Sequence, residues 1–336
     1  MRIARIDHEG GPRTAVITPE GRVRRLRADV GVLDLLAASP GERLALAADA
    51  EAELPLDAVN LLAPLAPPTL RDFSVFEAHI EGILMGEGRP VPDRWYREPF
   101  CYFSNPHAIT GPGDPIPVPP GSNYLDLELE VAAVIGRAGR NLTAEQAGEH
   151  IAGYTIFNDW SARDHAVDEM QLGLGFCKAK DFANTLGPWI VTSDELERYR
   201  AGDRLDLDLR ASINGRELGD DTLANMAWSF EELVAYASRG AWIRPGDVLG
   251  SGTCGSGSLF ELRGRGEDWM PLQPGDVVTL AVEGIGTITN EIVAGVEPVQ
   301  LPPARPGRLR HRAGLGGGPR LGGQACGPGR AAEVPR

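Results

Sequence analysis

Residues 124–136 read YLDLELEVAAVIG, and this stretch decides the kind of fold that the chain forms. Leucines alternate along it with Asp126, Glu128 and Glu130. Because side chains on a β-strand point alternately to its two faces, the pattern predicts a strand with an apolar face and an acidic face. The Cα atoms of Glu128 and Glu130 are then expected about 6–7 Å apart.

Two interpretations of the acidic face are open at this point. The flexible carboxylates of Glu128 and Glu130 can converge on one hard cation, which prefers oxygen ligands. The other interpretation is an edge strand whose acidic face lies in solvent, and for this run taken alone it is the commoner arrangement.

Short β-type runs continue through residues 71–302, the predicted main domain. Helices are few, and two have clear start signals, the capping boxes at 143–146 and 229–232. Many short strands with few helices predict a β-rich α+β fold. The other strand-like runs are GYTIFND, GPWIVT, LDLDLRASING, DVLGSGT and DVVTLAVEGIGTITNEIV.

Residues 1–70 are predicted to form a small N-terminal domain. Runs 1–7 and 13–18 alternate apolar and polar residues and are joined by a glycine-rich turn, which predicts a β-hairpin. A short helix is expected over 30–39, and a proline cluster from Pro64 onward marks a linker.

The formal net charge of −14 indicates an acidic protein. Non-specific nucleic-acid binding needs clustered Lys and Arg, so we expect no nucleic-acid partner. Residues 303–336 differ, because they hold seven Arg and one acidic residue among many Gly and Pro. We expect this tail to be disordered, since it offers too little apolar surface for a core. An RNA-binding or partner-binding role for its arginines is the alternative.

The four cysteines lack C-x-x-C spacing, which argues against a zinc site or a disulfide framework and fits a reducing compartment. The start of the chain, MRIARIDHEG, lacks the apolar run of a signal peptide. No stretch reaches the roughly 20 apolar residues that a membrane helix needs. We therefore expect a cytoplasmic protein without a membrane partner.

A third carboxylate follows another apolar run. Asp159 comes after GYTIF, within the polar string FNDWSARD at 157–164. It is either a ligand at the mouth of a strand or a capping residue in an ordinary turn. Three carboxylates without His or Cys indicate Mg²⁺, Mn²⁺ or Ca²⁺ rather than zinc.

Three other features carry weaker signals. A lone histidine such as His79 is more often packed or solvated than a catalytic base. Lys178 or Lys180 can present a cation to an anionic substrate, although surface lysines are the default. The glycine-rich segment 250–262 matches neither the phosphate-binding loop nor the dinucleotide fingerprint, so nucleotide binding is rejected.

Taken together, these segments resemble the fumarylacetoacetate hydrolase family over roughly residues 70–295. The resemblance implies a main domain of rolled, mixed β-sheets, a small N-terminal domain and a homodimer. The motifs that carry it, in order, are D-x-E-x-E at 126–130, N-D-W-S-A-R-D at 158–164, K-x-F at 180–182 and G-S-G-T at 250–253.

By position, the resemblance implies that Glu128, Glu130 and Asp159 hold a divalent metal ion, namely Mg²⁺ or else Mn²⁺ or Ca²⁺. Asp72 aligns with a fourth carboxylate found in the members that cleave fumarylacetoacetate. Such a metal polarises a carbonyl of a small 2-oxo or 1,3-diketo acid.

The resemblance also implies a catalytic set. His79, seven residues after Asp72, matches the catalytic histidine of the family, and Glu261 matches its glutamate partner. In this scheme His79 takes a proton from water, and Lys180 stabilises the negative charge that develops as a C–C bond breaks. The positions matched to substrate contacts or to their surroundings are Arg163, Tyr102 and Thr253.

One position departs from the family pattern. The cleaving members have a substrate-contacting Gln three residues after the arginine matched by Arg163, whereas this chain has Ala166, preceded by His165. Fumarylacetoacetate itself is therefore a doubtful substrate, and Ala166 is a candidate specificity position.

Three functional hypotheses follow. The leading one is a metal-dependent hydrolase that cleaves a C–C bond in an acylpyruvate-like acid, because the His79–Glu261 pair suits water activation. The second is a 2-oxo acid isomerase, decarboxylase, hydratase or lyase that uses the same metal chemistry. The third is a catalytically inactive binding protein, for which a broken carboxylate set or a missing histidine pair would be the sign.

Overall fold

A computed structural model describes residues 1–8 and 10–305, and Met1–Pro298 form one compact unit. Of the remainder, residues 299–305 are described, and they are exposed without helix or strand. The sequence predicts disorder for residues 303–336, and residues 306–336 of this tail lie outside the described residues.

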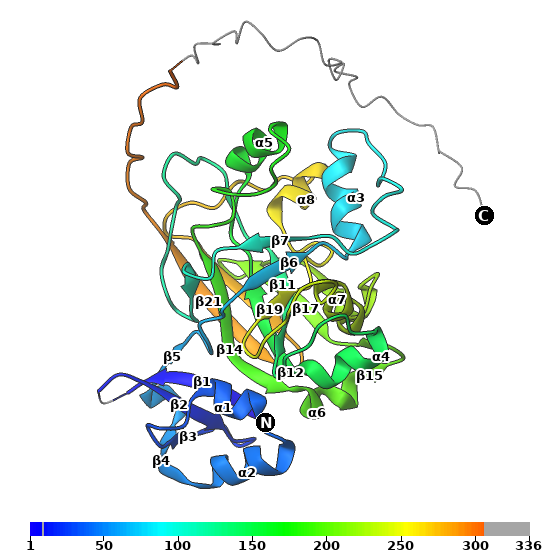
Figure 1. Ribbon diagram of the computed structural model, residues 1–336. Helices are drawn as coiled ribbons and strands as arrows, with labels where there is room; N and C mark the ends of the chain where they lie inside the picture. Colours follow the sequence, from blue (N-terminus) through cyan, green and yellow to red (C-terminus); the bar gives the residue numbers. More distant parts are fainter. Residues whose placement is uncertain (9, 306–336) are drawn as a thin grey trace, which may run out of the picture. The chain divides into compact units, whose positions relative to one another are not determined.

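The larger of the two main β-sheets has 12 strands and includes the N-terminal hairpin (Figure 1). Its strands are β1 (Arg2–Asp7), β2 (Pro12–Ile17), β3 (Arg22–Leu26), β4 (Ala50–Pro55), β5 (Asn60–Leu62), β6 (Leu70–Phe73), β7 (Cys101–Ser104), β8 (Ile109–Thr110), β11 (Leu129–Ile135), β12 (Ile151–Asn158), β14 (Asn184–Thr192) and β19 (Val248–Gly250). Their order is β4-β3-β2-β1-β14-β12-β11-β19-β6-β7, with β5 on β1 and β8 on β14. Most neighbours are antiparallel, but β19–β6 and β14–β8 are parallel.

A second sheet has five strands in the order β18-β17-β20-β21-β9. These strands are β9 (Ile116–Pro117), β17 (Asp208–Ile213), β18 (Arg216–Thr222), β20 (Val277–Val282) and β21 (Gly286–Val293). Two short pairs complete the strands: β10 (Leu125–Asp126) with β13 (Ser161–Ala162), and β15 (Arg200–Ala201) with β16 (Arg204–Leu205).

The helices of the described chain are short. They are α1 (Val32–Ala37), α2 (Pro40–Ala48), α3 (Glu77–Met85), α4 (Ala144–Ala147), α5 (Arg163–Gln171), α6 (Ser193–Leu196), α7 (Phe230–Ala237) and α8 (Leu259–Gly264), with 3-10 turns η1 (Leu56–Ala58), η2 (Gly148–His150), η3 (Glu197–Tyr199) and η4 (Leu223–Asn225). Within the described residues no helix has the length and apolar character needed to cross a membrane. The predicted β-rich α+β class is confirmed.

Local sequence signals explain several of these elements. The N-terminal hairpin forms as predicted, with Arg2 opposite Ile17 in β1 and β2. Strand β1 also pairs with β14, so the N-terminal residues extend the large sheet rather than forming a separate one. The predicted capping box at α7 is present, since the Ser229 hydroxyl accepts from Glu232 N and the Glu232 carboxylate accepts from Ser229 N.

The opening stretch is not one continuous strand. Strand β10 ends at Asp126 and β11 begins at Leu129. The Asp126 carboxylate accepts backbone N–H groups from Leu127, Leu259 and Phe260, which fixes it at the start of α8 rather than on a free strand face.

Strand β11 lies between β12 and β19, and all of its residues are buried. One face carries Leu129 and Val131 into the main core, where they join the apolar residues of the five-stranded sheet, and the other carries Ala132 and Val134 into a second core. The interpretation as an edge strand with a solvated acidic face is therefore wrong. The carboxylates of this stretch are enclosed by the fold.

Candidate metal centre and catalytic site

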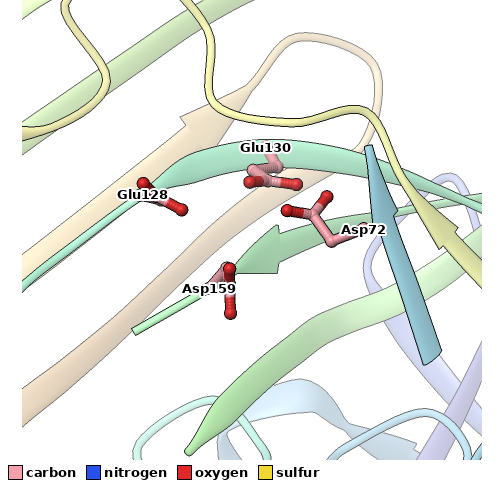
Figure 2. Close-up of side chains that lie close together, drawn as sticks. All are labelled: Asp72, Glu128, Glu130 and Asp159. Atoms are coloured by element: carbon pink, nitrogen blue, oxygen red, sulfur yellow. The ribbon is translucent and has the colours of Figure 1, made fainter. Parts of the chain in front are cut away.

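Four buried carboxylates converge on the half of the large sheet that holds β12, β11, β19 and β6 (Figure 2). Asp72 comes from β6, Glu128 and Glu130 come from the β11 segment, and Asp159 directly follows β12. Each offers an oxygen that lies within 4.8 Å of those of the others. The pairing of β11 with β12 and β19, and of β19 with β6, brings the three segments together.

Two glycines of the predicted glycine-rich segment make room for this cluster. A Cβ on Gly250 would lie 2.4 Å from Asp72 Oδ1 and 2.8 Å from Glu130 Oε2. Gly252, which has a φ of +81°, donates its N–H to the same two oxygens at 3.1 and 3.0 Å. These glycines therefore admit and orient carboxylates, a role that the sequence pattern does not reveal.

Burial makes three of the carboxyl groups hard to ionise in the metal-free protein. It raises the pKa of Asp72 to about 6 and the pKa of Asp159 to about 7. Burial and the neighbouring Asp72 raise the pKa of Glu130 well above its ordinary value. A divalent cation is the kind of partner that reverses such shifts, because it stabilises the ionised form.

Glu128 behaves in the opposite way. Burial acts to raise its pKa, but the positive charges of Lys180 and Arg163 together with His79 hold that pKa well below the usual range. Arg163 Nη2 donates to Glu128 Oε1 at 2.7 Å, and Lys180 Nζ contacts Glu128 Oε2. Glu128 is thus the anionic carboxylate of the set.

Lys180 and Tyr102 lie directly on the carboxylates. Lys180 Nζ is 2.5 Å from Asp159 Oδ2, and the Tyr102 hydroxyl donates to Asp72 Oδ2 at 3.0 Å and also contacts Asp159. The ring of Phe176 packs edge-on against Tyr102, with ring centroids 5.1 Å apart. Lys180 is buried, whereas the other candidate lysine, Lys178, is exposed.

The donor set fits a hard divalent cation. Glu130 Oε1 and Asp159 Oδ1 are buried oxygens without a hydrogen-bond partner among the described residues. Buried acceptors are normally satisfied, so unpartnered carboxylate oxygens in an all-oxygen cluster indicate an ion.

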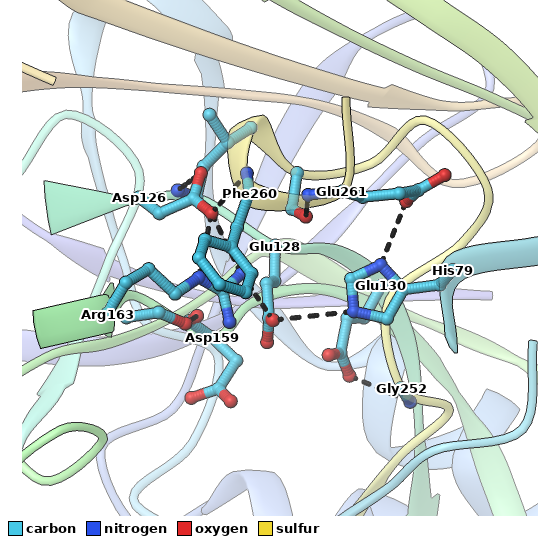
Figure 3. A network of polar contacts seen from close by, with 12 residues as sticks. His79, Asp126, Glu128, Glu130, Asp159, Arg163, Gly252, Phe260 and Glu261 are labelled. Carbon is cyan, nitrogen blue, oxygen red and sulfur yellow. Dashed lines mark hydrogen bonds and ion pairs between the residues drawn. The ribbon is translucent and has the colours of Figure 1, made fainter. Parts of the chain in front are cut away.

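His79 and Glu261 form a buried pair beside the cluster (Figure 3). They come from α3 and α8, and His79 Nδ1 lies 2.8 Å from Glu261 Oε2. The other ring nitrogen, Nε2, points toward the candidate metal ligands and is 3.7 Å from Glu128 Oε1. This arrangement suits a general base that its carboxylate partner orients.

Arg163 links the site to α8. Its Nε donates to Asp126 Oδ2 at 2.8 Å, and its guanidinium lies 5.3 Å from the Phe260 ring centroid. Both Asp126 and Arg163 are buried. Sequence reasoning left Asp126 without a role, although its place in the D-x-E-x-E motif was the available signal.

The two remaining candidates, Thr253 and Ala166, are buried and lie close in the chain to residues of the site. Thr253 is buried and follows Gly252 directly in the chain. Ala166 is buried one helical turn after Arg163 in α5. The structure thus brings His79, Glu261, Lys180, Arg163 and Tyr102 together with the four carboxylates, while the individual roles of all these residues stay predictions.

Comparisons with known proteins agree with this fold and site. The family described as fumarylacetoacetate (FAA) hydrolase C-terminal matches residues 70–293, and the family described as Rv2993c-like, N-terminal matches residues 1–64. The chain belongs to the fumarylacetoacetate hydrolase family.

Two relatives and one solved structure show the range of this family. The chain is 32% identical to "Oxaloacetate tautomerase fahd2, mitochondrial" of Xenopus laevis over 235 residues, which are 70% of this chain and 69% of that protein. It is 28% identical to 2,4-didehydro-3-deoxy-L-rhamnonate hydrolase of Sphingomonas sp. (strain SKA58) over 299 residues, 87% of this chain and 96% of that one. The X-ray structure of 5-carboxymethyl-2-hydroxymuconate delta-isomerase from Mycobacterium smegmatis superposes with a TM-score of 0.66 and 29% identity, covering 88% of this chain and 100% of that chain.

These relatives are named as a tautomerase, a hydrolase and an isomerase. The chain is an enzyme of this family, either a hydrolase or a related isomerase or lyase. The family does not by itself select among these reactions.

Proposed function

We propose that this enzyme hydrolyses a C–C bond in a small acylpyruvate-like 1,3-diketo acid. The observation that carries the proposal is the buried His79–Glu261 pair, in which the second ring nitrogen of His79, Nε2, faces the carboxylate cluster. Isomerisation of a 2-oxo acid requires no activated water, whereas hydrolysis does, and an oriented imidazole supplies the base for it.

Asp72, Glu128, Glu130 and Asp159 are the proposed ligands of a divalent ion, with Mg²⁺ as our first choice and Mn²⁺ or Ca²⁺ as alternatives. When bound, such an ion supplies Lewis-acid polarisation of a substrate carbonyl. The cluster's all-oxygen donor set supports this choice over zinc.

The chain's own residues then have distinct tasks. Glu261 accepts a hydrogen bond from the Nδ1–H group of His79, which leaves Nε2 to take a proton from the attacking water. Lys180 places its ammonium beside Asp159, where it is available to stabilise the negative charge on the departing enolate. Arg163, Tyr102, Thr253 and Ala166 are the proposed substrate-contacting or supporting positions.

A second candidate reaction is tautomerisation or isomerisation of a 2-oxo acid. The names of the Xenopus laevis tautomerase and the Mycobacterium smegmatis isomerase favour it. The two reactions differ in one observable, because only hydrolysis incorporates an oxygen atom from solvent water into a product carboxylate.

The test is a panel of acylpyruvates with Mg²⁺ or Mn²⁺, followed by loss of enol absorbance and by mass spectrometry in ¹⁸O-labelled water. We expect His79→Ala to lower kcat of hydrolysis by about 10²–10⁴-fold, as removal of a general base does, while Mn²⁺ binding measured by calorimetry persists. His107→Ala, at an exposed histidine, is the matched control and should leave kcat unchanged.

Two outcomes would contradict the proposal. Hydrolysis by His79→Ala at the wild-type rate would exclude His79 as the general base. Full hydrolysis by chelator-treated protein would exclude a role for the metal ion. Rapid tautomerisation of 2-oxo acids without ¹⁸O incorporation would establish the second candidate instead.

We also propose that the enzyme is a cytosolic homodimer. Phe103 lies on β7, the end strand of the large sheet, and is 65% exposed, so this sheet edge offers an apolar side chain to a second copy of the chain. Cys101, Cys177 and Cys254 are free thiols, consistent with a reducing compartment. Light scattering coupled to size-exclusion chromatography should give twice the chain mass, and a monomer at micromolar concentration would refute the dimer.

A further inference from the structure

Arg265 joins the two helices that carry the proposed base and its partner. It follows α8 as the C-cap residue, and its side chain is 30% exposed. Nη2 lies 2.6 Å from Glu261 Oε1 and also donates to the carbonyl oxygen of Ala78 at 3.0 Å. Ala78 precedes His79 in α3, so one guanidinium contacts the carboxylate of the pair and the backbone beside its histidine.

The two helices touch through glycines at this place. A Cβ on Gly264 would lie 2.1 Å from the Gly82 carbonyl oxygen, and a Cβ on Gly82 would lie 2.5 Å from Glu261 Cγ and 3.0 Å from Arg265 Nε. Because neither glycine has a side chain, the two helices approach closely here, and the side chains of Glu261 and Arg265 lie against the α3 backbone.

The hydrogen bonds of Glu261 are divided between its two oxygens. Oε1 is paired with the Arg265 guanidinium and accepts a hydrogen bond from the Ser256 N–H at 2.8 Å, whereas Oε2 faces His79 Nδ1. A carboxylate with one oxygen held by two donors has its other oxygen aimed in a fixed direction. That direction decides which nitrogen of His79 carries the proton.

We propose that Arg265 is a positioning residue that fixes the orientation of Glu261 and thereby keeps His79 in the Nδ1–H tautomer, with Nε2 free. The inference rests on the proposed function for its catalytic consequence, but not for its structural one. Arg265 itself contacts neither the carboxylate cluster nor, in this arrangement, the reacting atoms; it acts through Glu261.

The experiment compares Arg265→Gln, Arg265→Lys and Arg265→Ala with wild type. The matched control is Arg239→Gln, which breaks a surface pair whose Nη1–Oε1 distance to Glu98 is 2.7 Å. The readouts are the ¹⁵N shifts of His79 in histidine-labelled protein, kcat and KM for the best acylpyruvate, Mn²⁺ affinity by calorimetry, and recovery of Arg265→Ala by added guanidinium.

We expect wild-type His79 to be the Nδ1–H tautomer and Arg265→Gln to show a mixture of tautomers. Loss of an outer partner of a metal-ligating histidine typically costs about 10–100-fold in metal affinity or activity. We expect kcat to fall by a similar factor here, with KM and Mn²⁺ affinity nearly unchanged. Arg265→Lys should be intermediate, guanidinium should restore part of the kcat of Arg265→Ala, and Arg239→Gln should match wild type.

The proposal would be overturned if Arg265→Gln had the same His79 tautomer and the same kcat as wild type. A kcat loss in Arg265→Gln that Arg265→Lys does not lessen and guanidinium does not rescue in Arg265→Ala would also overturn it, since this would indicate a fold defect. If Arg265→Gln does not fold, Arg265→Lys carries the same tautomer test. If wild type cleaves no diketo acid, the proposed function fails, and the tautomer comparison decides the role of Arg265 alone.

Discussion

At the scale of single residues, Glu128 and Glu130 show how neighbours set chemistry. They are the same residue type, two positions apart, and both are buried. Burial acts to raise the pKa of both groups. At Glu128 the positive charges of Lys180 and Arg163 outweigh burial, so its pKa falls, whereas at Glu130 the neighbouring Asp72 raises the pKa further. The motif predicts two equivalent ligands, but only the three-dimensional surroundings distinguish a permanent anion from a carboxyl group that ionises with its metal.

Ala166 is the residue that we expect to restrict the substrate. A glutamine at this buried position would offer an amide donor and acceptor, which alanine cannot. One gained hydrogen bond of about 1 kcal/mol corresponds to roughly a fivefold change. Ala166→Gln should therefore raise kcat/KM for the more polar diketo acids by about that factor, measured across an acylpyruvate series.

The control for this prediction is Val167→Gln, because Val167 is adjacent and 56% exposed. It should leave the whole series unchanged. Efficient wild-type cleavage of fumarylacetoacetate, with no gain from Ala166→Gln, would show that position 166 does not select the substrate.

At the scale of elements, the contact between α3 and α8 determines whether the proposed catalytic pair exists. Each helix is short, and neither carries both members of the pair. Such helices have little stability alone, so their mutual position depends on packing. Close approach through Gly82 and Gly264 is therefore a functional feature as well as a structural one.

Gly82→Ala tests this contact. Alanine favours a helix interior over glycine by about 1 kcal/mol, but the added Cβ would lie 2.5 Å from Glu261 Cγ. Overpacking of this kind costs about 1–3 kcal/mol and should move the Glu261 side chain away from His79. We expect kcat to fall at least tenfold with a melting temperature within a few degrees of wild type.

Met85→Ala, at an exposed position of the same helix, is the control and should keep wild-type kcat. Wild-type kcat in Gly82→Ala would mean that the helices shift without disturbing the pair, and would remove the argument for close approach.

At the scale of the whole molecule, the cluster couples ionisation to unfolding, because its carboxylates come from segments that pair across the large sheet. Asp72 and Asp159 have pKa values raised to about 6 and about 7 in the folded, metal-free protein, and both return to ordinary values when it unfolds. The folded state therefore binds more protons than the unfolded state between about pH 4 and pH 7.

The sign of the pH dependence follows. The free energy of unfolding of the metal-free protein should fall as pH rises from about 4 to 7, by on the order of 2 kcal/mol for Asp72 alone. Excess Mn²⁺ should remove or reverse this slope, since it binds the ionised carboxylates. Urea unfolding at several pH values, with chelator or with Mn²⁺, measures both effects.

Asp72→Asn should reduce the slope of the chelated protein, because one of the titrating groups is gone. A free energy of unfolding that rises over this pH range in chelator, or that Mn²⁺ leaves unchanged, would contradict the assignment of the cluster as a metal centre.

The sequence by itself determined many of the elements and indicated the candidate chemically active groups. Alternation along β1, β2 and β11, the capping box of α7 and the glycine-rich segment all act over a few neighbouring residues, so they are visible without a structure. The order of four motifs was sufficient to indicate the family and the carboxylates Glu128, Glu130 and Asp159.

Only the tertiary structure decided how these groups meet. The alternating pattern around Leu129 does not show that β11 has a neighbouring strand on each side, because strand order depends on pairing between distant segments. Asp126 does not lie with Glu128 and Glu130 in the carboxylate cluster but binds Arg163 and the start of α8. His79 pairs with Glu261, which is 182 residues away in the chain. Local periodicity specifies which face a side chain takes on its own strand. Long-range packing determines what that face contacts. These contacts set the burial of each side chain, its charged neighbours and the direction of its pKa shift.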